Sequence, residues 1–119
     1  MDRLRSSGDI RHVMTAGSGA GTHAVVVHVA IPRKPFQGTS RSHHRVAVVA
    51  GRRVGNAVKR NRAKRRLRAI YPDTLSVQDV REPLDIVLVA KPGIASVGYK
   101  ELRNDVQSAF LRACKRLGS

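Results

Sequence analysis

The sequence predicts an α+β fold: a two-layer α/β sandwich with helices on one face of a small sheet and the element order α-β-β-α-β-α. Three short runs at 22–31, 45–50 and 84–90 are rich in β-branched and aliphatic residues, and the segments around them space their apolar residues as helices do. The chain has 119 residues, enough for one core, so we expect a single domain over 1–119. Aromatic residues make up 3% of the sequence, and the core must therefore be mainly aliphatic.

A first helix is predicted from its caps. Ser6 or Ser7 can accept a hydrogen bond from the first turn of a helix that runs to about Ala16. Gly17 then supplies the left-handed residue that ends the helix. Residues 18–21, which include two glycines, are expected to form a loop.

The runs at 22–31 and 45–50 are expected to be neighbouring strands. In the first run, alternate valines point to the core face of the sheet, while His28 lies on the opposite face. A long polar loop from Pro32 to His44 joins the two runs, and we expect them to pair antiparallel. The face that carries His28 would then remain open.

Two more helices and a third strand complete the prediction. A basic helix begins at Asn56 and is stopped by Pro72, directly after Tyr71. Residues 74–82 are polar and irregular, and the strand at 84–90 follows them. From Ser96 onward, apolar residues recur at steps of three and four, which indicates an amphipathic helix. These residues are Tyr99, Leu102, Val106, Phe110, Ala113 and Leu117.

The charge of the chain indicates a polyanionic partner. Lys and Arg number 23 against 8 Asp and Glu, which gives a formal net charge of +15 at pH 7. No acidic residue lies between Ile10 and Pro72, and nine of the seventeen residues from 52 to 68 are Lys or Arg. Nucleic acid is the first expectation and an anionic membrane the second. The planar fork of Arg suits phosphate and stacking contacts. We favour single-stranded or structured RNA over duplex DNA, although charge alone does not decide between them.

The basic segment at 52–71 has the pattern of a folded helix rather than of a disordered tail. Its apolar residues, which form one narrow stripe, are Ala63, Leu67, Ile70 and Tyr71. Like charges such as Arg62 and Arg66 stand four residues apart, and each such pair costs about 0.2–0.5 kcal/mol in an isolated helix. A merely solvated helix would interleave Glu, so bound phosphates explain the pattern better. The stripe is too narrow for strong insertion into a membrane surface.

The sequence offers little for catalysis or metal binding by the protein itself. Cys114 is the only cysteine, which excludes an intramolecular disulfide and a Cys-rich zinc site. A self-sufficient nuclease needs carboxylates for metal ions or a His pair, but His43 and His44 point to opposite sides of an extended chain. We expect Asp85 and the acids near it to serve ordinary solvation. No apolar run is long enough to span a membrane and no signal peptide is visible, so we expect a cytoplasmic protein.

The run from Gly55 to Arg68, GNAVKRNRAKRRLR, resembles the signature of the bacterial ribonuclease P protein component. Its centre is Arg60-Asn61-Arg62, followed by spaced cations. The flanks agree in order: a short first helix, the strand RVAVVA, an apolar strand, Lys-Pro and a terminal amphipathic helix. The resemblance covers essentially the whole chain.

This resemblance implies a subunit of a ribonucleoprotein endonuclease. The subunit would bind the catalytic RNA of ribonuclease P and the 5′ leader of precursor tRNA, and would promote removal of the leader while RNA and Mg²⁺ perform the chemistry. The resemblance also implies a left-handed crossover between parallel strands, where the general rule predicts a right-handed one. The resemblance places Arg60, Asn61, Arg62, Lys64, Arg65 and Arg68 along the helix that faces the catalytic RNA. From their charge we expect Arg52, Arg53, Lys59 and Arg66 to contact this RNA as well. The residues implied to contact the leader are Ile10, Met14, His28 and Tyr99.

The leader-contacting set departs from the family pattern at three positions. Ile10 and Met14 stand where the family commonly has Phe, and His28 stands where a strand Tyr is frequent. Stacking of a base on an aromatic ring is worth about 1–3 kcal/mol, so we expect these replacements either to weaken leader binding or to shift it toward apolar and phosphate contacts. The alternative of a different class is a small structural RNA-binding protein of the ribosomal type, which would bind RNA without promoting cleavage.

Overall fold

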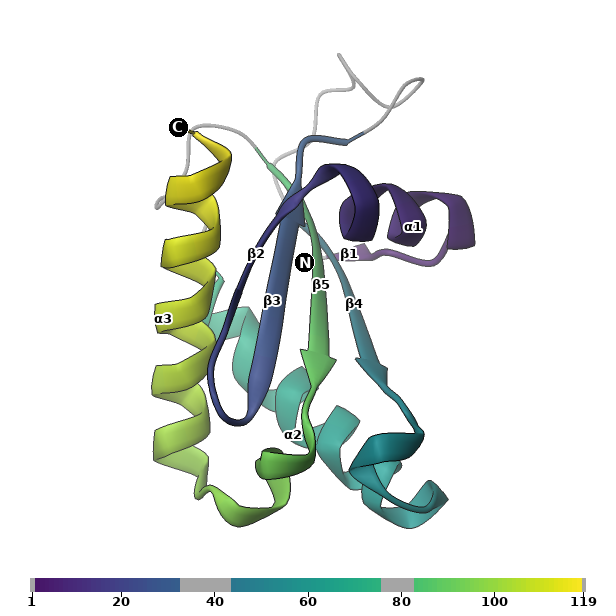
Figure 1. Cartoon of the computed structure of the whole chain (residues 1–119), viewed down its shortest axis with the longest axis vertical. Coiled ribbons are helices and arrows are strands. Elements are labelled where there is room, and N and C mark those ends of the chain that lie inside the picture. The colour runs from purple at the N-terminus through teal and green to yellow at the C-terminus, as the bar shows by residue number, and fades with distance from the viewer. Residues whose placement is uncertain (1, 33–43, 76–82, 119) are drawn as a thin grey trace.

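The computed structural model describes residues 2–32, 44–75 and 83–118, and it contains one sheet with the strand order β1-β4-β5-β3-β2 (Figure 1). The strands are β1 (Asp2–Arg3), β2 (Ser18–Gly21), β3 (Val25–Ala30), β4 (Arg45–Ala50) and β5 (Asp85–Ala90). The helices are α1 (Ser7–Ala16), α2 (Ala57–Thr74) and α3 (Tyr99–Leu117), with short 3₁₀ turns η1 (Arg52–Val54) and η3 (Pro92–Ser96). Most of the predicted loop before β4, and nearly all of the predicted irregular segment after α2, lie outside the described residues.

The predicted antiparallel pairing of the strands at 22–31 and 45–50 is wrong. β5 lies between them, antiparallel to β3 and parallel to β4. Five of the six residues of β5 are buried, so this strand is apolar toward both faces of the sheet. A continuously apolar strand is most stable in the centre, which leaves β3 and β4 to flank it.

The crossover from β4 through α2 to β5 is left-handed. In Figure 1 both strands run downward, β5 lies to the left of β4, and α2 passes behind them. This is the hand that the family resemblance implies, and it is opposite to the general rule for parallel crossovers.

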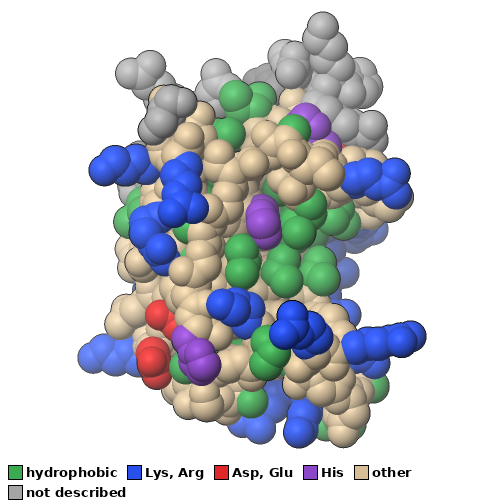
Figure 2. Space-filling view, in the orientation of Figure 1, with side chains coloured by type: hydrophobic (Ala, Val, Ile, Leu, Met, Phe, Trp, Pro, Cys, Tyr) green, Lys and Arg blue, Asp and Glu red, His purple; other side chains and the backbone are tan. Residues whose placement is uncertain are grey.

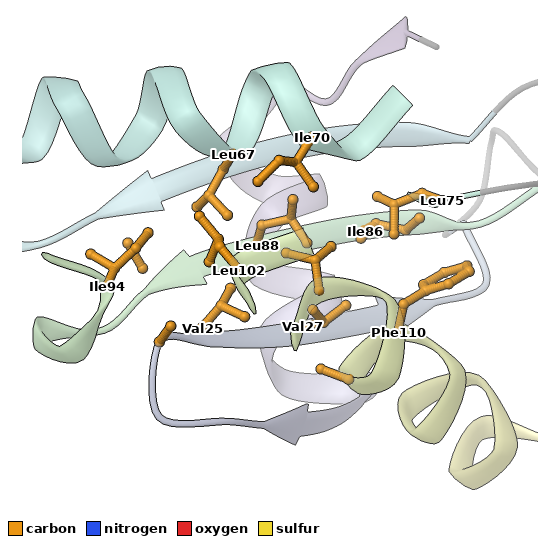
Figure 3. Close-up of a cluster of buried hydrophobic side chains, with 14 of the residues drawn as sticks. Val25, Val27, Leu67, Ile70, Leu75, Ile86, Leu88, Ile94, Leu102 and Phe110 are labelled. Atoms are coloured by element: carbon orange, nitrogen blue, oxygen red, sulfur yellow. The ribbon is translucent and has the colours of Figure 1, made fainter. Parts of the chain in front are cut away.

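The sequence predicted that all helices lie on one face of the sheet, and this prediction is wrong. α2 and α3 cover the face that buries the main core, while α1 packs against β3 and β5 on the other face. The largest buried side chains of the main core include those labelled in Figure 3: Val25, Val27, Leu67, Ile70, Leu75, Ile86, Leu88, Ile94, Leu102 and Phe110. A smaller cluster under α1 consists of Leu4, Val13, Ala30, Ala47 and Val87.

The segment after α1 departs from the prediction in two ways. Gly17 ends the helix as predicted, but its backbone is extended, with a φ of −87°. Glycine is needed there because a Cβ would collide with the carbonyl oxygens of Val13 and Val29. Residues 18–21 form β2 instead of a loop, because Ala20 enters the core while the glycines on either side leave the opposite face flat.

The helix α2 passes through Pro72 instead of stopping before it. Proline removes one helical hydrogen bond, but the last turn is held in other ways. The N–H of Leu75 donates to the carbonyl of Tyr71 at 3.0 Å, and the hydroxyl of Thr74 donates to the carbonyl of Ile70 at 3.2 Å. Burial of Thr74 and Leu75 adds to these bonds, so the helix ends at Thr74.

A buried ionic cluster of Arg45, Asp85 and Asp9 fixes α1 to the sheet. Arg45 donates from Nε to Asp85 Oδ1 at 2.8 Å and from Nη2 to Oδ2 at 2.6 Å, and its Nη1 lies 3.4 Å from Asp9 Oδ2. Both carboxylates are at most 1% exposed. The hydrogen bonds to Asp85 raise the pKa of the Arg45 guanidinium above its ordinary value. The solvation role predicted for Asp85 is therefore wrong.

Replacing Arg45 with Met should lower the free energy of unfolding by about 3–5 kcal/mol, because two buried carboxylates would lose their shared cation. Urea unfolding followed by circular dichroism measures the change. The matched control is Arg103→Met on the exposed side of α3, which should change the stability by less than about 0.5 kcal/mol. Equal stabilities for the two variants would show that the cluster is not structurally important.

Candidate nucleic-acid interface

The exposed side of α2 forms a continuous cationic surface. Ala63, Leu67 and Ile70 are buried against the sheet and α3, as the stripe in the sequence predicted, and this orientation turns the remaining circumference outward. The side chains of Lys59, Asn61, Arg62, Arg65 and Arg68 are exposed, and those of Arg60 and Lys64 are half-buried. In the part of the chain that the structure describes, no carboxylate forms an ion pair with any of these cations.

A tight turn sets Arg52 and Arg53 beside the start of this helix. Both lie exposed in η1, and the N–H of Gly55 donates to the carbonyl of Arg52 at 3.1 Å. Gly55 has a φ of +140°, a conformation that residues with a Cβ rarely adopt. The side chain of Asn56 then accepts from the N–H of Lys59 at 3.0 Å and caps α2. The turn thus extends the cationic surface past the helix N-terminus.

Arg66 differs from the other cations of α2. It donates from Nη1 to the carbonyl of Ile94 at 2.7 Å and from Nη2 to the carbonyl of Val97 at 2.5 Å. Ile94 lies within η3 and Val97 directly follows it, so Arg66 connects α2 to the segment that leads into α3. Charge alone placed Arg66 in the predicted RNA-binding set, and its two hydrogen bonds give it a structural role in holding α2 to η3.

The second surface is the part of the sheet that α1 leaves uncovered. Val26, Val49 and Val89 are half-buried there, on the side opposite α2 and α3. Figure 2 shows hydrophobic side chains gathered over the strands on this side, with Lys and Arg side chains around them. This apolar, cation-bordered face can accept bases at its centre and phosphates at its rim.

His28 lies on this uncovered face, as the alternation in the sequence predicted. It stands opposite Gly19 in the β2–β3 register, and a Cβ at Gly19 would lie 2.8 Å from His28 Nδ1. The ring therefore lies across the backbone of β2, in space that the glycine leaves free. Burial lowers the pKa of His28 below its ordinary value, which favours the neutral ring near neutral pH.

The other predicted leader residues differ in their surroundings. Ile10 is half-buried and packs against the cluster under α1, while Met14, one turn later, is 42% exposed. Tyr99 is 52% exposed at the first residue of α3. His28 and Tyr99 make no ring contact with each other among the described residues. The structure therefore places all four at or near the surface without joining them into one contact set.

Sequence reasoning missed the buried pair of Arg45 and Asp85, which positions α1 and the strands around the site. The pairing of Arg45 with Asp85 could have been sought, since two of the predicted strands begin at or next to oppositely charged residues.

Among the described residues, no group of three or more His, Cys, Asp or Glu is placed to hold a metal ion. No helix in the described ranges has the length and apolar character needed to cross a membrane.

Known proteins resemble this chain along nearly its whole length. The profile of the family described as Ribonuclease P matches residues 1–114. The ribonuclease P protein component of Micrococcus luteus is 36% identical over 116 residues, with 95% of this chain and 88% of that protein covered. The component from Symbiobacterium thermophilum is 39% identical over 111 residues, with 93% and 90% covered.

Solved structures support the fold. The RNase P protein of Staphylococcus aureus superimposes with a TM-score of 0.72 at 20% identity, over 95% of both chains. The protein from Thermotoga maritima superimposes with a TM-score of 0.69 at 22% identity, over 98% of this chain and 97% of that one. The match of the family profile and the curated relatives, together with the cationic α2 surface, lead to one conclusion: the chain belongs to the ribonuclease P protein component family.

Proposed function

We propose that this chain uses the cationic α2 surface to bind the catalytic RNA of ribonuclease P, and the uncovered sheet face to bind the 5′ leader of precursor tRNA. By holding both RNAs it promotes removal of the leader. The observation that supports this most strongly is the row of exposed cations on a packed helix, without carboxylate partners in the described chain. Such a surface suits a phosphate backbone.

The chemical step is assigned to the RNA with Mg²⁺. Guanidinium, ammonium and amide groups dominate the α2 surface, and the cations neutralise phosphates but cannot coordinate Mg²⁺. The protein's contribution is therefore positioning and charge neutralisation, which lower the Mg²⁺ concentration that the RNA needs. We expect this work to take place in the cytoplasm.

The uncovered face suits a single-stranded leader. Bases can lie on the apolar strands and on the neutral ring of His28, while Met14 offers an exposed, adaptable contact. Ile10 is half-buried against the cluster under α1, so it supports the uncovered face from below and offers no surface on which a base could stack. The leader would thus be held without reading a specific base sequence.

Cleavage of precursor tRNA at low Mg²⁺ tests the proposal and its alternative. The comparison is between catalytic RNA alone, RNA with this protein, and protein alone, with mapping of the new 5′ end. We expect correct cleavage only with RNA and protein together. Binding without stimulation would favour a structural RNA-binding protein, and cleavage by the protein alone would indicate an independent nuclease.

Replacing both Arg62 and Arg65 with Ala should weaken binding to the catalytic RNA and flatten its dependence on salt. Each lost phosphate contact should reduce the log–log slope by about 0.7–0.9. Filter binding over a salt series measures the slope. Arg66→Ala is an informative contrast, because it should lower the melting temperature while leaving the slope nearly unchanged. An unchanged slope for the double variant would contradict direct phosphate contact.

Replacing Tyr99 with Ala should reduce affinity for precursor tRNA more than affinity for mature tRNA. The loss expected for one stacked base is about 1–3 kcal/mol. The measurement is a paired titration of the assembled holoenzyme with the two tRNAs, and Lys100→Ala, at the neighbouring exposed position, is the control. If both tRNAs lose affinity equally, Tyr99 does not contact the leader.

His28 should titrate below its ordinary pKa of 6.5 in the free protein, because burial disfavours the charged ring. In the unfolded chain the ring binds its proton at higher pH, so the contribution of His28 to stability falls as the pH drops through 6.5. Adding a leader oligonucleotide should raise the pKa, since phosphates favour the charged form. NMR titration of the ring protons measures both pKa values. A pKa of His28 that does not change when the oligonucleotide is added would argue against contact between His28 and the leader.

A further inference from the structure

A groove at the free edge of β4 lies between the two surfaces described above and shares Arg68 with the cationic α2 surface and Val49 with the uncovered sheet face. Its walls come from the segment between β1 and α1, from β4 and from the later turns of α2. The residues that matter for its chemistry are Arg3, Arg5, Val48, Arg68 and Tyr71. No carboxylate lines the groove, so its charge is wholly positive.

The groove exists because β1 is short. β1 pairs with β4 only at Arg45 and Val46, and the N–H of Leu4 donates to the carbonyl of Val46 at 2.9 Å. Since the backbone groups of alternate strand residues point to the same edge, those of Val48 point outward as well. No backbone group of the described chain bonds the N–H of Val48 at that edge. The groove therefore contains a free backbone donor.

The side chains around this donor suit one nucleotide. Arg3, Arg5 and Arg68 are exposed at the groove and can donate forked hydrogen bonds to phosphate oxygens. Tyr71 is half-buried against the main core, so its ring is fixed where it lines the groove. A fixed aromatic ring beside several guanidinium groups is the usual setting for a stacked, unpaired base with its phosphate.

We infer that this groove holds an unpaired nucleotide of the catalytic RNA, with its phosphate against Arg3, Arg5 and Arg68 and its base against Tyr71. The inference rests on the proposed function. It assigns the nucleotide to the catalytic RNA because Arg68 lies one turn beyond Lys64 and Arg65 on α2. An RNA strand that follows the cationic surface thus reaches the groove without leaving the protein.

Arg5→Ala is the main test, because Arg5 is exposed, lies outside the helices and strands, and should not affect folding. Affinity for the catalytic RNA should fall about tenfold, the loss expected for one charge-assisted contact. Hydroxyl-radical footprinting of that RNA should lose protection at one unpaired segment. Arg103→Ala, which removes an equally exposed cation from α3, should change neither result.

Tyr71 supplies a second, independent variant pair. Tyr71→Phe keeps the ring and should bind as the unmodified protein does, while Tyr71→Leu should lose protection at the same segment as Arg5→Ala. Thermal melting establishes that both Tyr71 variants are folded at the binding temperature. If Tyr71→Phe also loses protection at this segment, the hydroxyl and not the ring makes the contact, and the stacking part of the inference is overturned.

The groove inference fails by itself if the unmodified protein binds the catalytic RNA and stimulates cleavage while Arg5→Ala leaves affinity and footprint unchanged. It also fails if the lost protection falls on precursor tRNA instead. If the unmodified protein does not bind the catalytic RNA at all, the proposed function fails and the inference falls with it.

Discussion

The first rung of the parallel β4–β5 pair holds the structure together. There Arg45 stands opposite Asp85, and its guanidinium also reaches Asp9 at the start of α1. Three elements that are distant in the sequence are thereby fixed at one end of the sheet. Because buried charges are stable only with their partners, this rung allows little change in strand register. It determines how much of the sheet α1 covers, and so how much of this face stays exposed.

The left-handed crossover packs a strongly cationic helix against the sheet, and the like charges of this helix repel one another. Like charges four residues apart cost about 0.2–0.5 kcal/mol per pair in an isolated helix. Burial of side chains the size of Leu67 and Ile70 contributes about 1.5–3 kcal/mol each, which exceeds several such penalties. The core therefore holds the charges close together before RNA arrives. Phosphates bound there, as proposed, would relieve the repulsion, so binding and stability should reinforce each other.

Local signals were sufficient for most elements and insufficient for their arrangement. The strand at 45–50 and the amphipathic helix from Tyr99 to Leu117 were predictable because branching and spacing are local properties. β2 was not, because Gly and Ala carry no strand preference; its carbonyls at Gly19 and Gly21 accept from Arg116 and Arg112 of α3. The strand order was also predicted wrongly, because the central position goes to the strand that is buried on both faces, and this burial depends on the whole fold.

The same limit applies to the candidate site. Every arginine has the same chemistry in the sequence, yet Arg45 and Arg66 are held by acceptors on other elements, whereas Arg62 and Arg65 have none among the described residues. The acceptors of Arg66 lie 28 and 31 residues away in the chain, beyond the reach of any local pattern. Charge content therefore identifies the class of partner, and only the fold separates the cations that hold the protein together from those with no acceptor among the described residues. By that criterion Arg5, exposed beside a free backbone donor, belongs with the second group although it lies far from the basic helix in sequence.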